Sequence, residues 1–404
     1  MRFRYSAEKN GRLVKKALVY TRDEHGIDFS DVDGEAVSIT ARLRAAGYDT
    51  YVVGGAVRDL ILGKKPKDFD IVSEASPARI KKIFRNARII GHRFRLVHVY
   101  FGPKIYEVST FRSLRDGPTS NTFGAVEEDV LRRDFTMNAL LYDPGKQIVV
   151  DYVGGMKDIR EKRVRPIIPL ATIFTDDPVR MIRAVKYAAA AGFRLPLSLK
   201  WRIKKQSPLL ASVSPSRLTE EIFKIIRSSS ASLIVEALEA LGLYEYLQPG
   251  ASRLMKSSPD FRGRYLQSME ALNRPEFKNL PGEAMAALIQ DYLEDSTDWE
   301  GGIAENYKNT FALARAFVLP MNPPRVELDN AVRLVFAGHG ITIKKSRSLE
   351  RGAGGFRSRL DAAGDPLPGP GETAAEGARK RRRSGRGVRR RRKSPGPETE
   401  GAPE

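Results

Sequence analysis

Two aspartates separated by one residue, Asp68 and Asp70, are the side chains of this sequence best suited to hold a divalent cation. They follow an apolar run that ends in the glycine pair Gly54 and Gly55, and Arg58 comes shortly after that pair. Glycines let backbone N–H groups approach phosphate oxygens closely, and a helix that starts there adds unsatisfied N-terminal donors. Aspartates two positions apart project from one face of a strand, so both could hold cations at a polyphosphate. The arrangement predicts a site for a nucleoside triphosphate.

Neither half of this arrangement is specific by itself, because glycine pairs usually mark ordinary turns and paired aspartates usually mark a solvated strand face. The surroundings favour the functional interpretation. Apolar Phe69, Ile71 and Val72 indicate a buried strand, and a buried strand does not carry two aspartates without a partner such as a metal ion. The pair is preceded by three cations, Lys64, Lys65 and Lys67.

A second cluster combines positive and negative charge at Arg132, Arg133 and Asp134. Asp134 stands just before a helix-like stretch, so it could cap a helix while the arginines face solvent. In the functional alternative, the arginines meet triphosphate or RNA phosphates, and Asp134 is a third carboxylate near the metal ion or orients it. Glu107 is a rival third carboxylate, because its apolar neighbours place it on a strand, but it could equally form a salt bridge at a sheet edge.

Asp177, Arg180 and Arg183 are spaced three residues apart, which brings them within reach of a common helix face. One interpretation is a carboxylate at a helix N-terminus that pairs with an arginine of the same helix. The other is recognition of a nucleobase edge, in which the aspartate accepts from an exocyclic amine and arginine donates to ring nitrogens or carbonyls. Adenine or cytosine would suit such a pair, because both carry an amino group.

Arg93 and Arg95 lie in a basic and aromatic segment that also contains His92, Phe94 and His98. Such a segment could stack on and clamp a single-stranded nucleic-acid end. The alternative is an ordinary surface loop. On the first interpretation, Arg93 and Arg95 bind RNA.

The composition favours a polyanionic partner and restricts the chemistry. The 404 residues carry 69 Lys and Arg against 49 Asp and Glu, a net charge of +20, which points to nucleic acid. Eleven basic residues and no acidic ones lie between Arg379 and Lys393, and subtracting them leaves +9 for the rest of the chain. Because there is no cysteine and only four histidines, disulfides, thiol chemistry and Cys-containing zinc sites are excluded. Carboxylates and cations must do the chemistry.

The sequence contains no signal for a membrane. Met1 to Leu18 is basic but has no continuous apolar segment, and nowhere does an apolar run reach the length of a membrane span. We therefore expect a cytoplasmic protein. A chain of 404 residues with 41% hydrophobic content is long enough for two or three domains.

Around the glycine pair, the pattern predicts helices alternating with strands after an irregular leader. Asp33 can cap a helix that stops at Gly47, and Ser76 with Pro77 can begin another. The expected helices are residues 35–46, 56–62 and 77–84, and the expected strands are residues 48–53, 68–72, 87–90, 95–101 and 105–111. Helices that interrupt a mixed sheet indicate an α/β or α+β domain.

The second half of the chain follows a different pattern. Residues 135–141 are helix-like and residues 147–152 extended, and Asp177 with Pro178 opens a helix that runs to Ala191. Long amphipathic stretches down to about Gly338 predict an all-helical region. Residues beyond Lys345 are rich in Gly, Pro, Ala and Arg, which predicts a disordered basic tail.

Five ordered motifs resemble those of the class II nucleotidyltransferases. This family comprises the tRNA CCA-adding enzymes and the bacterial poly(A) polymerases, within the DNA polymerase beta-like superfamily. The resemblance covers roughly Lys15 to Gln248. Its motifs are Val53–Asp59, Asp68–Asp70, Arg132–Asn138, Asp151–Gly155 and Asp177–Arg183.

Three further features are similar to the bacterial poly(A) polymerases in particular. They are the segments Arg22–Ile27 and Arg85–Gly102 and the arginine-rich tail. The chain departs from that pattern in two places: His92 stands where a basic arginine or lysine is expected, and the loop from Ser113 to Gly124 is shorter.

The resemblance implies an α+β fold, with a polymerase beta-like nucleotidyltransferase domain followed by an all-helical region. The implied domains are a leader (1–30), a catalytic head (31–165), a helical neck that binds nucleotide and RNA (166–250), a C-terminal helical RNA-binding domain (251–344) and a disordered Arg-rich tail (345–404).

The resemblance also implies roles for the residues singled out above. Asp68 and Asp70 would bind Mg²⁺ in a two-metal site, and Asp134 matches an active-site aspartate of the poly(A) polymerases. The residues expected to bind nucleotide are Gly54, Gly55, Arg58, Arg132 and Arg133 at the triphosphate and Asp177, Arg180 and Arg183 at the base.

The implied activity is template-independent addition of AMP from ATP to RNA 3' ends, with release of pyrophosphate and with mRNA or other transcripts as the RNA. A tRNA CCA-adding enzyme that uses CTP and ATP is the first alternative, because it shares these motifs. A non-catalytic RNA-binding protein on the same scaffold is the second.

Overall fold

The computed structural model describes residues 2–7, 13–91, 96–113, 122–272 and 281–343. All of the described residues belong to one compact unit, which falls within residues 1–364. The expected tail and residues 92–95, which include Arg93 and Arg95, lie outside the described residues.

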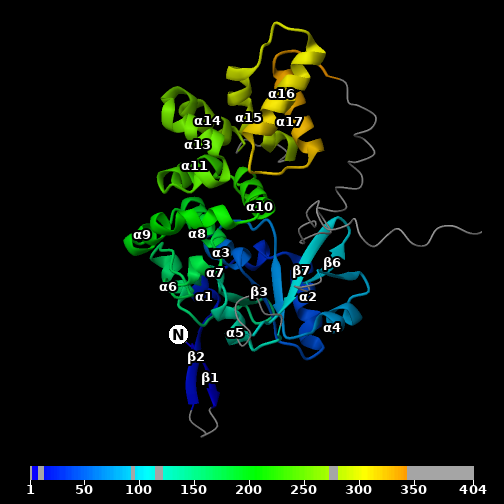
Figure 1. Cartoon of the computed structure of the whole chain (residues 1–404). Coiled ribbons are helices and arrows are strands. Elements are labelled where there is room, and N and C mark those ends of the chain that lie inside the picture. Colours follow the sequence, from blue (N-terminus) through cyan, green and yellow to red (C-terminus); the bar gives the residue numbers. More distant parts are fainter. Residues whose placement is uncertain (1, 8–12, 92–95, 114–121, 273–280, 344–404) are drawn as a thin grey trace, which may run out of the picture. The chain divides into compact units, whose positions relative to one another are not determined.

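The described N-terminal residues form a nine-stranded sheet (Figure 1). Its strands are β1 (Arg2–Ala7), β2 (Leu13–Tyr20), β3 (Thr50–Val53), β4 (Asp70–Ser73), β5 (Ala87–Ile90), β6 (Leu96–Phe101), β7 (Lys104–Thr110), β8 (Leu141–Asp143) and β9 (Ile148–Asp151). They lie in the order β1-β2-β9-β8-β3-β4-β7-β6-β5. Strands β4 and β7 pair in parallel, and the other described neighbours are antiparallel. The predicted mixed sheet is confirmed.

The central strands β3 and β4 are buried on both faces of the sheet. Val52 and Ile71 belong to one hydrophobic cluster, whereas Tyr51, Val53 and Val72 belong to a second cluster on the other side. Successive side chains of a strand point to opposite faces, so this division follows from the alternation. The turn after β3 therefore starts from a rigid position.

Short helices connect these strands, and three of them lie where the pattern predicts helices, at residues 35–46, 56–62 and 77–84. The carboxylate of Asp33 accepts the backbone N–H groups of Glu35 and Ala36 and so begins α2, which buries Ile39 and Leu43. The helices of this part are α1 (Arg22–His25), α2 (Gly34–Ala45), α3 (Gly55–Ile61), α4 (Pro77–Ile83), α5 (Val126–Leu131) and α6 (Gly155–Arg160).

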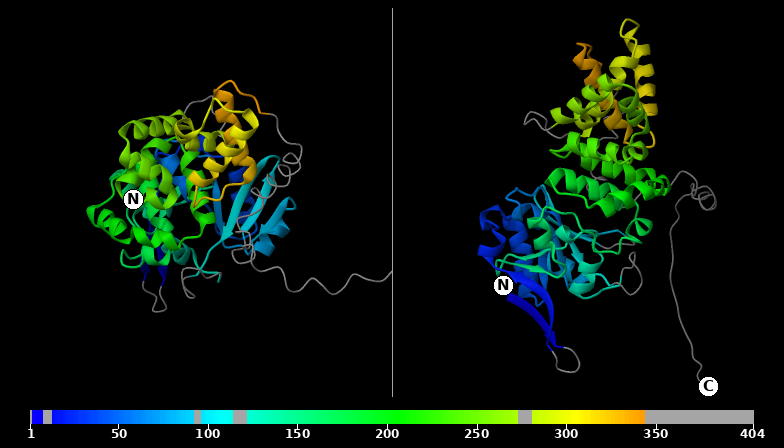
Figure 2. Two further views of the ribbon diagram at one scale, coloured as in Figure 1. Left: turned by 45° about the horizontal axis from the view of Figure 1, so that its top comes forward. Right: turned by 90° about the vertical axis from the view of Figure 1, so that its left-hand side faces the viewer.

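From residue 173 to residue 338, the regular elements of the described chain are all helices, as predicted (Figures 1 and 2). One hydrophobic cluster extends from Val52 in the sheet to Phe336 near the end of α17. The helices are α7 (Ile173–Asp176), α8 (Val179–Ala191), α9 (Leu197–Gln206), α10 (Pro215–Ile226), α11 (Ala231–Ala240), α12 (Tyr244–Leu247), α13 (Pro249–Ser257), α14 (Pro259–Ala271), α15 (Pro281–Ser296), α16 (Ile303–Phe317) and α17 (Arg325–Gly338). Within the described ranges, no helix has both the length and the apolar character needed to cross a bilayer.

The expectation of an irregular leader is wrong. Strands β1 and β2 pair with each other, and β2 adds to the sheet by pairing Leu18 with Asp151 and Tyr20 with Val149 of β9. Both figures show this ribbon projecting from the edge of the sheet. The strand with which β2 pairs lies some 130 residues later in the sequence, so no local pattern predicts this pairing.

Two boundaries also differ from expectation. Residues 135–141 are not a helix, because the backbone at Asp134 and Thr136 pairs with residues 165 and 167, leaving only a 3₁₀ turn at Thr136–Asn138 before β8. Strand β4 begins at Asp70, the partner of Val53, so Asp68 lies in the preceding loop.

Candidate active site

A cleft of about 1350 Å³ brings together nearly all of the predicted site residues. Its walls come from the turn after β3, the loop before β4, the segment after α5, and helices α8 and α10. The predicted residues that line it are Gly54, Gly55, Arg58, Asp68, Asp70, Arg132, Arg133, Asp134, Asp177, Arg180 and Arg183. Side chains from three separate stretches of sequence therefore face one space.

The register of β3 against β4 places the glycine turn beside the acidic pair. Val53 is paired with Asp70, so the chain turns at Gly54 directly next to that carboxylate. Gly54 has a φ of +78°, and a Cβ atom added there would lie 3.5 Å from Oδ2 of Asp70. A residue other than glycine would be strained at this turn.

The carboxylate of Asp70 is reached by water within the cleft, but protein atoms surround it on other sides. This burial, together with the negative charges of Glu107 and Asp68, raises the pKa of Asp70 to about 6, although Arg133 opposes the shift. Within the described part of the chain, neither Asp68 nor Asp70 has a hydrogen bond or an ion pair. Negative charge is thus concentrated, without a partner, in a cleft whose charged side chains are mostly cationic.

That arrangement fits a divalent cation. No group of three or more candidate metal-binding side chains exists among the described residues, so an ion at Asp68 and Asp70 would need oxygens from water and nucleotide phosphates. Mg²⁺ is usually bound in this way, by one or two carboxylates plus substrate phosphates.

The two candidates for a third carboxylate lie in different surroundings. Glu107 is on β7, which runs parallel to β4 with Val108 beside Ile71, and its charge acts on Asp70. Nε2 of His98 lies 3.5 Å from Oε1 of Glu107.

Asp134 lies toward the helices. Its Oδ1 accepts the backbone N–H of Phe135 at 2.8 Å and the side-chain amide of Asn138 at 3.3 Å. Burial and the charge of Asp134 raise the pKa of Tyr187 on α8. Of the two carboxylates, Glu107 is therefore the one that acts electrostatically on the acidic pair.

Arg58 is held in place from three sides. Its Nη1 donates to Oδ1 of Asn138 at 2.8 Å, its Nη2 lies 2.7 Å from Oδ1 of Asp59, and its guanidinium lies over the Tyr187 ring at 5.2 Å. An arginine fixed in this way loses little further freedom when it meets an anion.

Arg132 and Arg133 belong to a crowded group of cations. Arg133 pairs with Asp129 at 2.8 Å, and Arg132 donates to the carbonyl of Ser113 at 3.3 Å. Burial and the neighbouring charge of Arg112 lower the pKa of Arg132. Cations that repel one another in this way would be stabilised by a bound polyanion.

Asp177 does not pair with an arginine of its own helix. Both of its carboxylate oxygens lie 3.0 Å from Nη2 of Arg217 on α10. Arg180 donates to the carbonyl of Ile173 at 3.3 Å, and Arg183 pairs with Glu221 at 3.3 Å. The three predicted residues do face the cleft, but each has a separate partner.

Glu221 is a buried member of the site that the sequence interpretation missed. Burial alone would raise its pKa, but Lys186, Lys224 and Arg183 lower the pKa of Glu221 to about 2. Lys186 Nζ lies 2.6 Å from its Oε2. The sequence contains a signal for this role, because Glu221 falls on the apolar face of α10 with Leu218. A buried acidic residue needs a cationic partner. Arg217 is exposed and had no such signal.

The lysines before the acidic pair connect opposite walls of the cleft. Lys64 Nζ donates to the carbonyl of Ala190 near the end of α8 at 3.1 Å, and Lys67 Nζ donates to that of Arg227 just after α10 at 2.9 Å. Backbone carbonyls at helix C-termini lack partners within the helix, so cations are favourable there.

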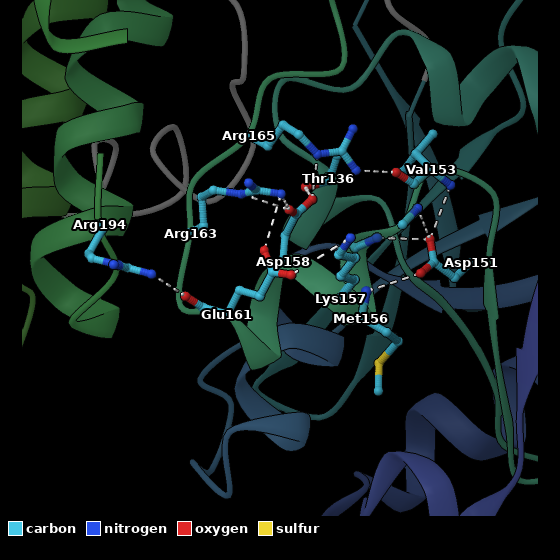
Figure 3. Close-up of polar contacts among 12 residues, drawn as sticks. Thr136, Asp151, Val153, Met156, Lys157, Asp158, Glu161, Arg163, Arg165 and Arg194 are labelled. Carbon is cyan, nitrogen blue, oxygen red and sulfur yellow. Dashed lines mark hydrogen bonds and ion pairs between the residues drawn. The ribbon is translucent and has the colours of Figure 1, made fainter. Parts of the chain in front are cut away.

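One buried aspartate braces the segment that carries Asp134, and a second holds the turn that follows β9 (Figure 3). Asp158 accepts the hydroxyl of Thr136 at 2.7 Å, and its ion pairs to Arg163 and Arg165 are 2.9 and 2.7 Å long. Asp151 accepts four backbone N–H groups, those of Val153, Gly154, Gly155 and Met156. The motif Asp151–Gly155 is therefore structural.

The chain is similar to known poly(A) polymerases. A family model described as "Poly A polymerase head domain" matches residues 50–165, and one described as "Probable RNA and SrmB- binding site of polymerase A" matches residues 192–255. Poly(A) polymerase I of Salmonella typhi is 37% identical over 74% of this chain and 70% of its own length. Poly(A) polymerase I of Haemophilus influenzae is 36% identical over 72% of this chain and 69% of its own length.

CCA-adding enzymes are also similar, over a shorter part of the chain. That of Geobacillus stearothermophilus is 36% identical over 58% of this chain and 60% of its own length. The crystal structure of the Bacillus stearothermophilus CCA-adding enzyme in complex with CTP matches with a TM-score of 0.53 at 27% identity, covering 80% of this chain and 91% of that one. The predicted nucleotidyltransferase fold, followed by a helical region, is confirmed.

Proposed function

Because the chain belongs to the family of bacterial poly(A) polymerase I, we propose that it adds AMP from ATP to RNA 3' ends without a template and releases pyrophosphate. The observation that carries this proposal is the cleft in which an unpartnered acidic pair faces a wall of arginines and lysines. We also propose that transcripts such as mRNA are the substrate and that the protein is located in the cytoplasm.

In this reaction, the oxygen of the RNA 3'-hydroxyl forms a bond to the α-phosphorus of ATP. The bond from that phosphorus to the oxygen that bridges to the β-phosphate breaks, and pyrophosphate leaves with the electron pair while the hydroxyl proton passes to solvent. The protein forms no covalent intermediate. Its residues act by positioning the two reactants and by stabilising charge.

The cations of the cleft would bind the triphosphate. Arg58, which Asn138 and Asp59 hold in place, and the crowded pair Arg132 and Arg133 are suited to phosphate oxygens, because a guanidinium donates in a fork that matches them. Gly54 and Gly55 would let backbone N–H groups approach the same oxygens.

The base would be read by Asp177 and Arg180, supported by Arg183. An aspartate accepts from the amino group of adenine, and an arginine donates to a ring nitrogen. Arg217, whose Nη2 lies 3.0 Å from both oxygens of Asp177, would hold that carboxylate in the orientation needed for this contact, which gives Arg217 a positioning role.

Asp68 and Asp70 would hold Mg²⁺, as one or two ions, and the raised pKa of Asp70 with its unpartnered oxygens supports this assignment. When bound, such ions polarise the α-phosphate and neutralise the departing pyrophosphate. Glu107 would add negative charge beside the pair, while Asp134 would orient Asn138 and, through it, Arg58.

A CCA-adding enzyme is the alternative, because a relative with that activity is 36% identical over 58% of this chain. The greater coverage by poly(A) polymerases, 74% in the Salmonella typhi protein, favours polyadenylation.

One product assay distinguishes the two activities from RNA binding alone. The purified protein is given a generic RNA with ATP, and separately a tRNA that lacks its CCA end with ATP and CTP. A long ladder on the generic RNA supports the proposal. Addition that stops after CCA on the tRNA would establish the alternative, and the absence of any product would mean an RNA-binding protein without activity.

A further inference from the structure

Helix α9 follows the cleft-lining helix α8 (Figure 1), and it presents an aromatic and apolar face to solvent. Leu197 is 83% exposed and Trp201 is 59% exposed, and they lie one helical turn apart. The opposite face is buried through Leu199 and Ile203, which anchor the helix to the core. An exposed tryptophan on a well-anchored helix is a rigid surface.

The same helix is strongly basic. It carries four cations and no acidic residue: Lys200, Arg202, Lys204 and Lys205. No ion pair involves any of the four in the part of the chain that the structure describes. Nζ of Lys205 lies 5.0 Å from the centre of the Trp201 ring, and the Arg202 guanidinium lies 5.8 Å from it.

Arg194, just before α9, adds to this charge. Its guanidinium donates to the backbone carbonyl of Glu161, a neutral partner that leaves the positive charge uncompensated (Figure 3). We call Leu197, Lys200, Trp201, Lys204 and Lys205 the Trp201 face.

The Trp201 face is within reach of the cleft. Ala190 and Ala191, at the end of α8, line the cleft, and α9 begins at Leu197. Six residues of fully extended chain span at most about 20 Å. A single strand of RNA whose 3' end lies in the cleft therefore needs only a few more nucleotides to reach Trp201.

We propose that the Trp201 face binds the single-stranded RNA upstream of the 3' end, with a base stacked on Trp201 and phosphates against Lys200, Lys204 and Lys205. This inference rests on the proposed function, since it assumes that the RNA 3' end enters the cleft. Aromatic rings flanked by cations bind single strands without regard to sequence, because every base has a face that stacks.

The charge of α9 decides between RNA and a protein as the occupant. The family model that matches residues 192–255 is described as binding both RNA and a protein, without assigning either to a helix. A row of cations on a helix that carries no acidic residue suits a polyanion. A protein partner is the outcome to which the test below would point instead.

Tryptophan fluorescence can test this proposal, because the chain contains only two tryptophans, Trp201 and Trp299. In the full chain carrying Trp299→Phe, emission comes from Trp201 alone. A single-stranded RNA of mixed sequence with a blocked 3' end should quench that emission saturably, with the same midpoint as binding measured by anisotropy of the labelled RNA. In the Trp201→Phe chain, the same RNA should leave the emission of Trp299 unchanged.

Substitutions give a second measurement. Trp201→Ala should weaken binding of the blocked RNA by about tenfold, and Trp201→Phe should retain most of the affinity. Lys204→Gln and Lys205→Gln should each reduce the slope of log affinity against log salt by about 0.7. Leu233→Ala, at a residue that is also 59% exposed, and Lys308→Gln on α16 are the matched controls and should change neither quantity.

Binding of the blocked RNA without a response of Trp201, and with unchanged affinity in Trp201→Ala, would overturn the proposal and leave α9 as a surface for a protein. Because the RNA cannot be extended, this result is independent of catalysis. A chain that quenches normally but extends no RNA fails only the proposed function, whereas a chain that extends a short primer but never quenches fails only this inference.

Discussion

At the scale of single residues, some side chains that line the cleft have partners within the protein and others do not. Arg58, Arg183 and Asp177 are each held by a neighbouring side chain, whereas Asp68 and Asp70 have no hydrogen bond or ion pair among the described residues. Groups that must hold the substrate in one position benefit from such fixing. Groups that bind an ion must keep their lone pairs available.

Arg217→Ala should weaken the use of ATP without preventing it. The substitution removes the cation that holds both oxygens of Asp177 at 3.0 Å, so the carboxylate loses its orientation toward the base. We expect KM for ATP to rise roughly tenfold or more, because the loss of one hydrogen bond to a charged group has an effect of about this size. The change in kcat should be smaller. Steady-state kinetics at saturating RNA measure this.

The control for that variant is Arg253→Ala, which removes an exposed arginine of α13. An equal rise in KM in both variants would mean that the effect is one of overall charge, and the positioning role of Arg217 would have to be abandoned.

Glu221→Gln should destabilise the protein. The change removes one buried charge from a group of three cations, Lys186, Lys224 and Arg183, and leaves them to repel one another. A buried partner lost in this way costs about 3 kcal/mol, so the thermal unfolding midpoint should fall. Glu220→Gln, the exposed neighbour on the same helix, should unfold at the temperature of the unsubstituted protein. Equal midpoints for the two variants would contradict the argument.

The sequence was sufficient to predict most of the residues that line the cleft and insufficient for their partners. Asp68, Asp70 and Arg58 stand in short motifs whose chemistry can be recognised locally. Arg217 cannot be recognised in this way, because its role depends on Asp177, which is 40 residues away in the sequence. Asn138 lay within a recognised motif, but its contact with Arg58 bridges 80 residues.

At the scale of elements, two features position the chemistry. The register that pairs Val53 with Asp70 brings the glycine turn to the acidic pair. The brace formed by Asp158 and the turn at Gly155 holds Thr136, and therefore the segment of Asp134. The first feature could be expected from the order of strands and turns, while the second required the pairing of residues 134–136 with residues 165–167.

Gly155→Ala tests the brace. A Cβ atom at Gly155 would clash with the carbonyl oxygen of Thr136, so the backbone segments around Gly155 and Thr136 would have to move apart. Such overpacking costs about 1–3 kcal/mol, and we expect a lower unfolding temperature together with slower AMP addition. Gly263→Ala in α14, where nothing lies within 4 Å of the added atom, should be neutral or slightly stabilising. Unchanged stability in Gly155→Ala would refute the close contact.

The element that the sequence interpretation missed is the β1–β2 ribbon. Lys15 and Lys16 interrupt the apolar run of β2, and the strand that β2 joins, β9, comes some 130 residues later. Strand propensity depends on such neighbours, which a local pattern does not contain.

At the scale of the whole molecule, the charge is divided between the folded part and the C-terminal residues. Eleven of the twenty excess positive charges lie between Arg379 and Lys393. Removing all residues after Lys345 should therefore flatten the salt dependence of RNA binding, because fewer counterions are released. Addition of the first nucleotide should persist, since the predicted site residues that line the cleft all come before residue 345. An unchanged salt slope would count against an RNA contact by this segment.

The proposed activity depends on the acidic pair, and Asp70→Asn tests it most directly. The substitution keeps the shape of the side chain and removes its charge. The measurement is transfer of labelled AMP from ATP to an RNA 3' end, alongside RNA affinity by anisotropy, with Asp31→Asn at an exposed position as the control. We predict that Asp70→Asn loses at least about a hundredfold in rate while RNA affinity stays within a few fold and the control is fully active. AMP transfer by Asp70→Asn at the rate of the unsubstituted protein would contradict the account.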